Sequence, residues 1–278
     1  MEKKIIGHET QREYLQSCIK SNQLSHAYFF VGPAHVGKMT IASWFMDTLA
    51  PVERIFLPSD EQTSISLDDI RDLLEKLSRS NHDGGYRAIC ISHVDTLNAQ
   101  AGNALLKCLE EPPKKTVFIL CADQEQGVLQ TLVSRCAIVR FSLLPLSDII
   151  AALQMRGCTK GEQLAALSAG RPGCALRLME DPTYCQLVEK ADDVLKKTAN
   201  KPVWQRLVPW QNIESTDALE CAELSAHLSL RECLESDGPG PLLTRRAKDS
   251  SEMANRIMQL RRVPVLQSSK SLFDRLFI

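Results

Sequence analysis

Residues 32–40 read GPAHVGKMT, which has the spacing of a phosphate-binding loop. In the pattern G-x-x-x-x-G-K-[S/T], the glycines let backbone N–H groups approach the phosphates, the lysine reaches the β and γ oxygens, and the hydroxyl ligates Mg²⁺. Both glycines and the lysine are present, but Met39 replaces the hydroxyl-bearing residue. An apolar run at 27–31 predicts a strand before the loop, and residues 39–49 have helical apolar spacing after it. This order favours nucleotide-binding ancestry over a glycine-rich turn.

Four residues of the loop are candidate nucleotide ligands, namely Gly32, Gly37, Lys38 and Thr40. His35 counts against a working loop, because a positive φ at its position would cost a non-glycine residue about 1 kcal/mol. We expect the loop to bind ATP or ADP weakly and without hydrolysis, or to bind no nucleotide.

The carboxylates that usually accompany such a loop are missing from the next predicted strand. That strand covers residues 87–91 and is followed by Ser92 and His93. An aspartate for Mg²⁺ and a glutamate for the attacking water are expected there. Asp95 lies two residues further on, where capping or a turn is the ordinary role. Loss of a general base costs about 10² to 10⁴ in rate, so we predict no ATP hydrolysis, with His93 as a substitute base the less favoured alternative.

Four further blocks resemble bacterial clamp-loader subunits, and the resemblance extends over roughly residues 3–180. The blocks are IIGHE at 5–9, LSHAYFF at 24–30, LNAQAGNALLKCLEEPP at 97–113 and TLVSRC at 131–136. The third of them is the most specific. The resemblance implies an α/β fold, with a P-loop AAA+ domain built on a parallel sheet, a small helical lid and a C-terminal all-helical collar.

Within this family the chain is most similar to the delta-prime type of subunit, whose own ATP site is degenerate. The family's lid motif would place its arginine at Gly173, and Arg171 is out of register. Arg135 of the Ser-Arg-Cys motif is kept, which implies an arginine finger that acts in trans on the ATP of a neighbouring subunit. The resemblance also implies its partners: the gamma/tau and delta subunits directly, the sliding clamp indirectly, and primed DNA through the complex.

The cysteines argue against a structural metal. The family usually inserts a four-cysteine zinc module where this chain has residues 50–69, which contain no cysteine. The chain has ten cysteines and no C-x-x-C pair, so we expect no zinc and no other metal site. Most of the cysteines are flanked by apolar residues and are interpreted as small buried hydrophobic residues in a reducing compartment.

The spacing of apolar runs predicts an α/β domain followed by helices. We expect a nucleotide-binding-like AAA+ domain at 1–143, a helical lid at 144–181 and an oligomerising collar at 182–278. The short apolar runs that predict the strands lie at 27–31, 88–91, 116–121 and 137–141. Helices beyond residue 145 are predicted at 147–155, 160–169, 171–179, 183–199, 216–235 and 242–262, with a last amphipathic segment at 272–277.

One helix of the α/β domain has an unusual end. Its apolar stripe runs from Ala101 to Leu109 and is stopped by prolines at 112 and 113. Glu110 and Glu111 stand at the C-terminal end, where the helix dipole disfavours negative charge. A functional role is one interpretation, and a solvated loop end is the favoured one.

Charge and hydropathy exclude some classes of protein. The formal net charge of −1 provides no general attraction to nucleic acid. No apolar run approaches the roughly 18 residues that span a bilayer, and no signal sequence precedes Gly7, so we expect a cytoplasmic protein with no membrane contact. The alternatives that stay open are an active gamma/tau-like ATPase, an unrelated P-loop kinase and a regulatory nucleotide sensor.

Overall fold

The computed structural model describes residues 5–58, 65–78 and 85–198. The chain divides into two compact units, Met1–Leu144 and Pro145–Ile278, and each is described by itself. The predicted helices at 216–235 and 242–262, and the last segment at 272–277, lie outside the described residues.

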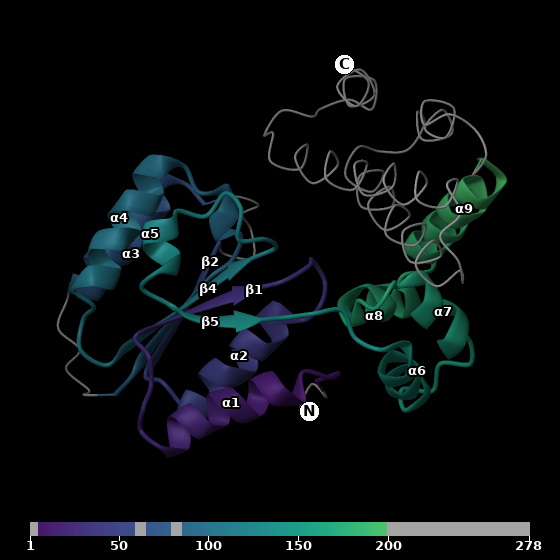
Figure 1. Ribbon diagram of the computed structural model, residues 1–278, viewed down its shortest axis with the longest axis horizontal. Coiled ribbons are helices and arrows are strands. Elements are labelled where there is room, and N and C mark those ends of the chain that lie inside the picture. The colour runs from purple at the N-terminus through teal and green to yellow at the C-terminus, as the bar shows by residue number, and fades with distance from the viewer. Residues whose placement is uncertain (1–4, 59–64, 79–84, 199–278) are drawn as a thin grey trace, which may run out of the picture. The chain divides into compact units, whose positions relative to one another are not determined.

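The first unit is built on a five-stranded sheet in which every neighbouring pair is parallel (Figure 1). The strand order is β2-β3-β4-β1-β5. The strands are β1 Ala27–Val31, β2 Glu53–Leu57, β3 Arg87–Ile91, β4 Thr116–Ala122 and β5 Ala137–Arg140. This confirms the predicted parallel α/β class, and β2 is a strand that the sequence analysis missed.

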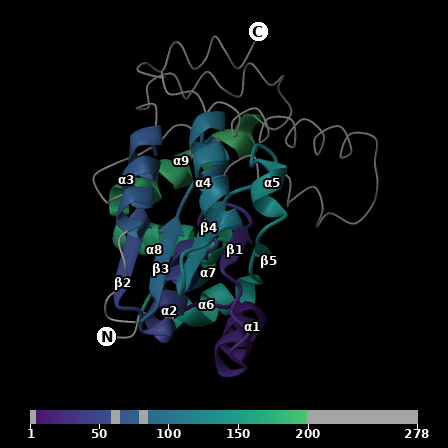
Figure 2. The ribbon, with the colours of Figure 1, turned by 90° about the vertical axis from the view of Figure 1, so that its left-hand side faces the viewer.

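Helices cover both faces of the sheet (Figure 1). Successive side chains of a strand point to opposite faces, so the apolar side chains of the central strands need cover on both sides. Tyr28 and Phe30 of β1 belong to one core with residues of α1 and α2, while Phe29 belongs to a second core with residues of α3, α4 and α5. Figure 2 shows α3, α4 and α5 side by side, and α4 contacts both of its neighbours. The helices are α1 Glu9–Lys20, α2 Lys38–Leu49, α3 Leu67–Ser78, α4 Ala99–Glu110 and α5 Gln130–Val133.

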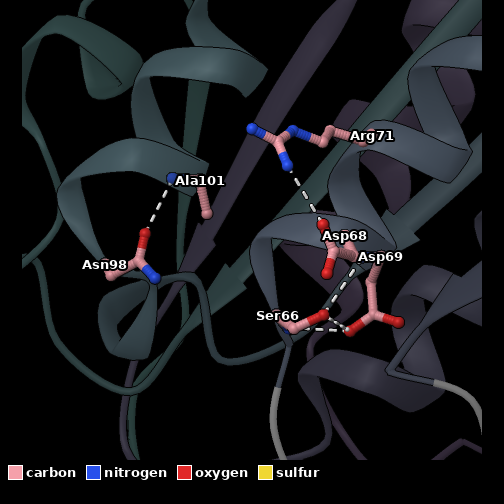
Figure 3. A network of polar contacts seen from close by, with 6 residues as sticks. All are labelled: Ser66, Asp68, Asp69, Arg71, Asn98 and Ala101. Atoms are coloured by element: carbon pink, nitrogen blue, oxygen red, sulfur yellow. Dashed lines mark hydrogen bonds and ion pairs between the residues drawn. The ribbon is translucent and has the colours of Figure 1, made fainter.

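Side-chain caps start α3 and α4 (Figure 3). Before α3, the Ser66 N–H donates to the Asp69 carboxylate at 2.7 Å and the Asp69 N–H donates to Ser66 Oγ at 3.1 Å. Before α4, Asn98 Oδ1 accepts the Ala101 N–H at 2.8 Å. Such caps satisfy backbone donors that have no partner within the helix. Asn98 therefore caps the start of α4, a helix of twelve residues whose last residue is Glu110.

The described part of the second unit is helical. It contains α6 Leu146–Gln154, α7 Gly161–Leu167, α8 Pro172–Glu180 and α9 Pro182–Thr198. Each lies close to a predicted helix, and α7 contacts the other three. The Arg177 guanidinium lies 3.9 Å from the centre of the Tyr184 ring, which joins α8 to α9. Across the described ranges, every helix is too short or too polar to cross a membrane. The division into three domains at 143/144 and 181/182 stays a prediction.

Candidate nucleotide site and exposed arginine

The carboxyl ends of three strands meet at one edge of the sheet. Val31 of β1 is in register with Ala122 of β4, and Ile91 of β3 is in register with Leu120 of β4. The segments that follow these strands are the phosphate loop after β1, Ser92 and His93 after β3, and Asp123 after β4. The topology therefore gathers at one place the groups on which a nucleotide would depend.

The phosphate loop contains one glycine in tight surroundings and two residues with positive φ. A Cβ atom added to Gly32 would lie 2.2 Å from the Phe141 carbonyl oxygen, so no other residue fits there without a backbone shift. Gly37 has a φ of 105° and His35 a φ of 60°. The positive φ considered for His35 is thus present, and it places a strained non-glycine residue in the loop.

A buried histidine from the N-terminal segment holds the loop in place. The Nε2 atom of His8 is 2.8 Å from the Val36 carbonyl oxygen, so the ring donates a hydrogen bond to the loop backbone. The ring also packs edge-on against Phe141, with 5.0 Å between centroids. Burial lowers the pKa of His8, and the hydrogen bond to Val36 opposes that shift. Burial therefore favours the neutral form of the imidazole that anchors the loop.

Lys38 is already fully hydrogen-bonded within the protein. Its Nζ donates to the carbonyl oxygens of Gly32 and Pro33 at 2.6 and 2.7 Å, and to Asp123 Oδ1 at 2.9 Å. The Lys38 side chain is 8% exposed. An ammonium group has three N–H donors, and three protein oxygens accept them. The charge that would bind a phosphate is instead neutralised by a carboxylate of the same chain.

A sulfur atom, Met39 Sδ, replaces the metal-binding hydroxyl oxygen of a working phosphate loop, and it lies against a second sulfur in the core. Met39 Sδ is 3.8 Å from Cys90 Sγ of β3, and a hydrogen bond with Cys121, together with burial, raises the pKa of Cys90. Mg²⁺ takes oxygen ligands, so the Met39 sulfur is not suited to bind it. Thr40 is exposed in the first turn of α2.

The two residues after β3 do not replace the missing carboxylates. Both the N–H and the Oγ of Ser92 lie within hydrogen-bond distance of the Leu57 carbonyl oxygen, at 2.7 and 3.3 Å, which directs the hydroxyl to the end of β2. His93 has a φ of 52° and precedes a single 3-10 turn, η1 Val94–Thr96, which contains Asp95. The residues at this edge therefore do not fit a magnesium-bound nucleotide. Within the described ranges no group of three His, Cys, Asp or Glu side chains could hold a metal ion.

The predicted lid positions lie in the second unit. Gly173 is in the first turn of α8, and Arg171 immediately precedes that helix. Arg171 is buried, at 3% exposure. Gly173 has no side chain, so neither position presents an exposed guanidinium.

Arg135 follows α5 and precedes β5, and its side chain is 35% exposed. Its Nη1 donates to the Thr131 carbonyl oxygen at 2.9 Å and lies 3.4 Å from Ser134 Oγ. Its Nη2 donates to Glu110 Oε1 at 2.7 Å. Glu110 is exposed, as the favoured interpretation of the helix end predicts, but that interpretation missed its ion pair with Arg135.

The sequence analysis also missed Asp123 as the partner of Lys38. The available signal was its position directly after a buried strand, because the end of that strand lies at the same sheet edge as the loop after β1. The other predicted ligands come together as expected from their adjacency in sequence. Nothing in the structure tests the predicted roles of Gly32, Gly37, Lys38, Thr40 or Arg135.

Comparisons with known proteins agree on one group of replication proteins. A family model described as "DNA polymerase III, delta subunit" matches residues 52–145. The chain is 29% identical over 181 residues to DNA polymerase III subunit tau of Bacillus subtilis, covering 58% of this chain and 32% of that protein. It is 33% identical over 156 residues to the replication factor C small subunit of Natronomonas pharaonis, covering 55% and 47%. It is 30% identical over 207 residues to DNA polymerase III subunit delta' of Pseudomonas aeruginosa, covering 63% of each.

The chain thus spans between about a third and two thirds of the length of these relatives. Among solved structures, RuvB of Thermotoga maritima superposes with a TM-score of 0.53 at 16% identity, covering 92% of this chain and 88% of that one. A DNA polymerase III gamma subunit-related protein of the same organism superposes with a TM-score of 0.51 at 16% identity, covering 94% and 97%. At this identity the likeness concerns the fold, and it supports the predicted P-loop AAA+ class.

Proposed function

Because this chain belongs to the clamp-loader family, related to DNA polymerase III tau and gamma subunits and to replication factor C, we propose that it is a non-hydrolysing, delta-prime-type subunit. It supports ATP-driven loading of a sliding clamp on primed DNA, and its direct partners are the gamma/tau and delta subunits. In this proposal residues 1–143 form the AAA+ domain, 144–181 the lid and 182–278 the collar that joins the subunits.

The observation that carries the non-hydrolysing role is the state of Lys38. Its ammonium group is bonded to three oxygens of its own chain, one of them the Asp123 carboxylate. A nucleotide phosphate would have to replace these acceptors while approaching a carboxylate of like charge, which costs free energy. The missing metal hydroxyl at Met39 and the missing carboxylates at Ser92 and His93 act in the same direction. Several independent features of one site therefore oppose hydrolysis.

The trans-acting role rests on Arg135. Its guanidinium is partly exposed, beyond the end of α5, where a second protein surface can reach it. A guanidinium that enters a neighbour's site stabilises the charge on the transferring phosphoryl group, and such arginine fingers are worth about 10³ to 10⁵ in rate. Lysine would substitute poorly, because it lacks the planar fork that engages two phosphate oxygens. This chain would then lend an arginine to a neighbour without turning over ATP itself.

A first experiment separates the proposal from its nearest rival, an active ATPase. The purified chain is expected to hydrolyse ATP at the background rate, measured by phosphate release in the presence of Mg²⁺. Turnover on the order of 1 s⁻¹ is an ordinary enzyme rate. If the chain shows such turnover and Lys38→Ala abolishes it, the chain is an active P-loop ATPase and the non-hydrolysing proposal is wrong.

A second experiment tests Arg135 in the complex reconstituted with the partner subunits. Arg135→Ala is expected to silence one ATP site in single-turnover hydrolysis and to slow clamp loading disproportionately, with assembly unchanged. Arg140→Ala is the matched control, because Arg140 is an exposed arginine at the other end of β5 and has its own acidic partner, Glu125, at 3.3 Å. Wild-type hydrolysis and clamp loading by Arg135→Ala would reduce Arg135 to a surface charge and refute the trans-acting role.

A further inference from the structure

Glu110 stands where a carboxylate is electrostatically misplaced. It is the last residue of α4, and the C-terminal end of a helix carries partial negative charge from its free carbonyl groups. Its carboxylate nevertheless has a defined partner, because Oε1 accepts a hydrogen bond from Arg135 Nη2 at 2.7 Å. The pair joins the end of α4 to the end of α5, two helices that contact each other.

Stability does not account for this pair. The repulsion between a carboxylate and a helix C-terminus is similar in size to the attraction within a solvent-exposed ion pair, so the two largely cancel. Water reaches both side chains, which are 44% exposed for Glu110 and 35% exposed for Arg135, and solvent screening weakens the attraction further. The pair therefore contributes little to folding, and its main effect is on the position of Arg135.

The guanidinium of Arg135 is held from two sides. Glu110 binds Nη2, and the Thr131 carbonyl oxygen of α5 binds Nη1 at 2.9 Å. A free arginine side chain samples many rotamers, and ordering it on binding costs conformational entropy. Here the side chain is ordered before any partner arrives. Since a guanidinium has five N–H donors, two such contacts still leave donors for a phosphate.

We infer that Glu110 is a positioning residue for Arg135: it fixes the guanidinium in the orientation that meets the phosphate of a nucleotide bound to the adjacent subunit. The inference rests on the trans-acting role proposed above for Arg135. Glu110 touches neither nucleotide nor reacting atoms, and it acts only through Arg135. Its removal is therefore expected to slow hydrolysis at the adjacent site without weakening the affinity of that site for ATP.

The test uses the reconstituted complex and resolves the hydrolysis phase that Arg135→Ala removes. Glu110→Ala is expected to slow that phase by about threefold to tenfold, the range expected from freeing one long side chain, with an unchanged KM for ATP. Glu110→Gln is expected to lose less, because its amide oxygen still accepts a hydrogen bond. Glu111→Gln, which removes the same charge from the adjacent exposed residue, is expected to match the wild type.

A double-mutant comparison isolates the route of the effect. In an Arg135→Ala background, Glu110→Ala is expected to cause no further loss of total ATP hydrolysis, because the residue that it positions is gone. An equal loss in both backgrounds, or an unchanged or faster rate in Glu110→Ala alone, would overturn the inference while the role of Arg135 stands. Wild-type hydrolysis by Arg135→Ala would instead refute the trans-acting role, and the inference with it. Thermal unfolding of each isolated variant verifies folding, and Glu110→Gln decides the matter if Glu110→Ala does not fold.

Discussion

Replacing Lys38 with methionine is expected to destabilise the isolated chain by about 2 kcal/mol. In a P-loop whose lysine awaits a phosphate, the same change would remove a ligand-binding group and leave stability nearly unchanged. Here the Lys38 side chain is only 8% exposed, and its ammonium group donates three hydrogen bonds, at 2.6, 2.7 and 2.9 Å. Methionine has a similar length and fills the same volume, so the change isolates the polar contacts.

The magnitude follows from the acceptors that lose their donor. The carbonyl groups of Gly32 and Pro33 lie in a part-buried site, and each buried acceptor without a donor costs about 1 to 3 kcal/mol. Asp123 is 26% exposed, so water can replace its lost partner and its contribution is small. Methionine also avoids the desolvation penalty of a buried ammonium group. The net effect is therefore near the lower end of the summed cost of the two carbonyl acceptors, at about 2 kcal/mol.

Urea unfolding followed by circular dichroism measures this difference, and Lys114→Met, at an exposed loop position, is the control for a surface lysine. Adding millimolar ATP and Mg²⁺ to the wild type is expected to leave its unfolding midpoint unchanged, since a bound ligand would stabilise the folded state by RT ln(1 + [L]/Kd). A stability of Lys38→Met within about 0.5 kcal/mol of the wild type, the usual range for surface changes, would refute the structural role. An ATP-dependent rise in the urea midpoint would show that the folded chain binds ATP and would contradict this expectation.

Three further outcomes are expected. Burial lowers the pKa of His8 below its ordinary value of 6.5, so the unfolded chain binds a proton that the folded chain does not. Stability should therefore fall as the pH drops below about 6.5, the unfolded pKa, toward the lowered folded pKa, with a smaller slope in His8→Gln when urea midpoints are compared. Burial raises the pKa of Cys136 to about 12, so iodoacetamide at pH 8 should alkylate it about a hundredfold or more slowly than a free cysteine, as measured by peptide mass spectrometry. Gly32→Ala should lower the free energy of unfolding by about 2 to 3 kcal/mol, measured by thermal unfolding, because its Cβ would meet a carbonyl oxygen at 2.2 Å. Gly37→Ala has open space around its Cβ and should lose only about 1 kcal/mol of stability, owing to its positive φ.

The central strands of the sheet were readable from the sequence because they are buried on both faces. Such strands appear as continuous apolar runs between turn residues, and the runs at 27–31 and 116–121 match β1 and β4. The edge strand β2, Glu53–Leu57, was not predicted, because it carries Glu53 and Arg54 and its residues are exposed or only half-buried. Its identity as a strand depends on pairing with β3, which no local pattern reveals.

The same distinction separates the parts of the site. The spacing of the phosphate loop, the substitution at Met39 and the Ser-Arg-Cys motif around Arg135 are local in sequence, so the chain itself displays them. The two ion pairs are not local: Lys38 and Asp123 are 85 positions apart, and Glu110 and Arg135 are 25 apart. The first exists because β4 lies beside β1 in the sheet, and the second because α4 packs against α5. Residue types and spacing thus indicate a phosphate loop and an arginine, whereas strand order and helix packing decide which carboxylate each cation meets.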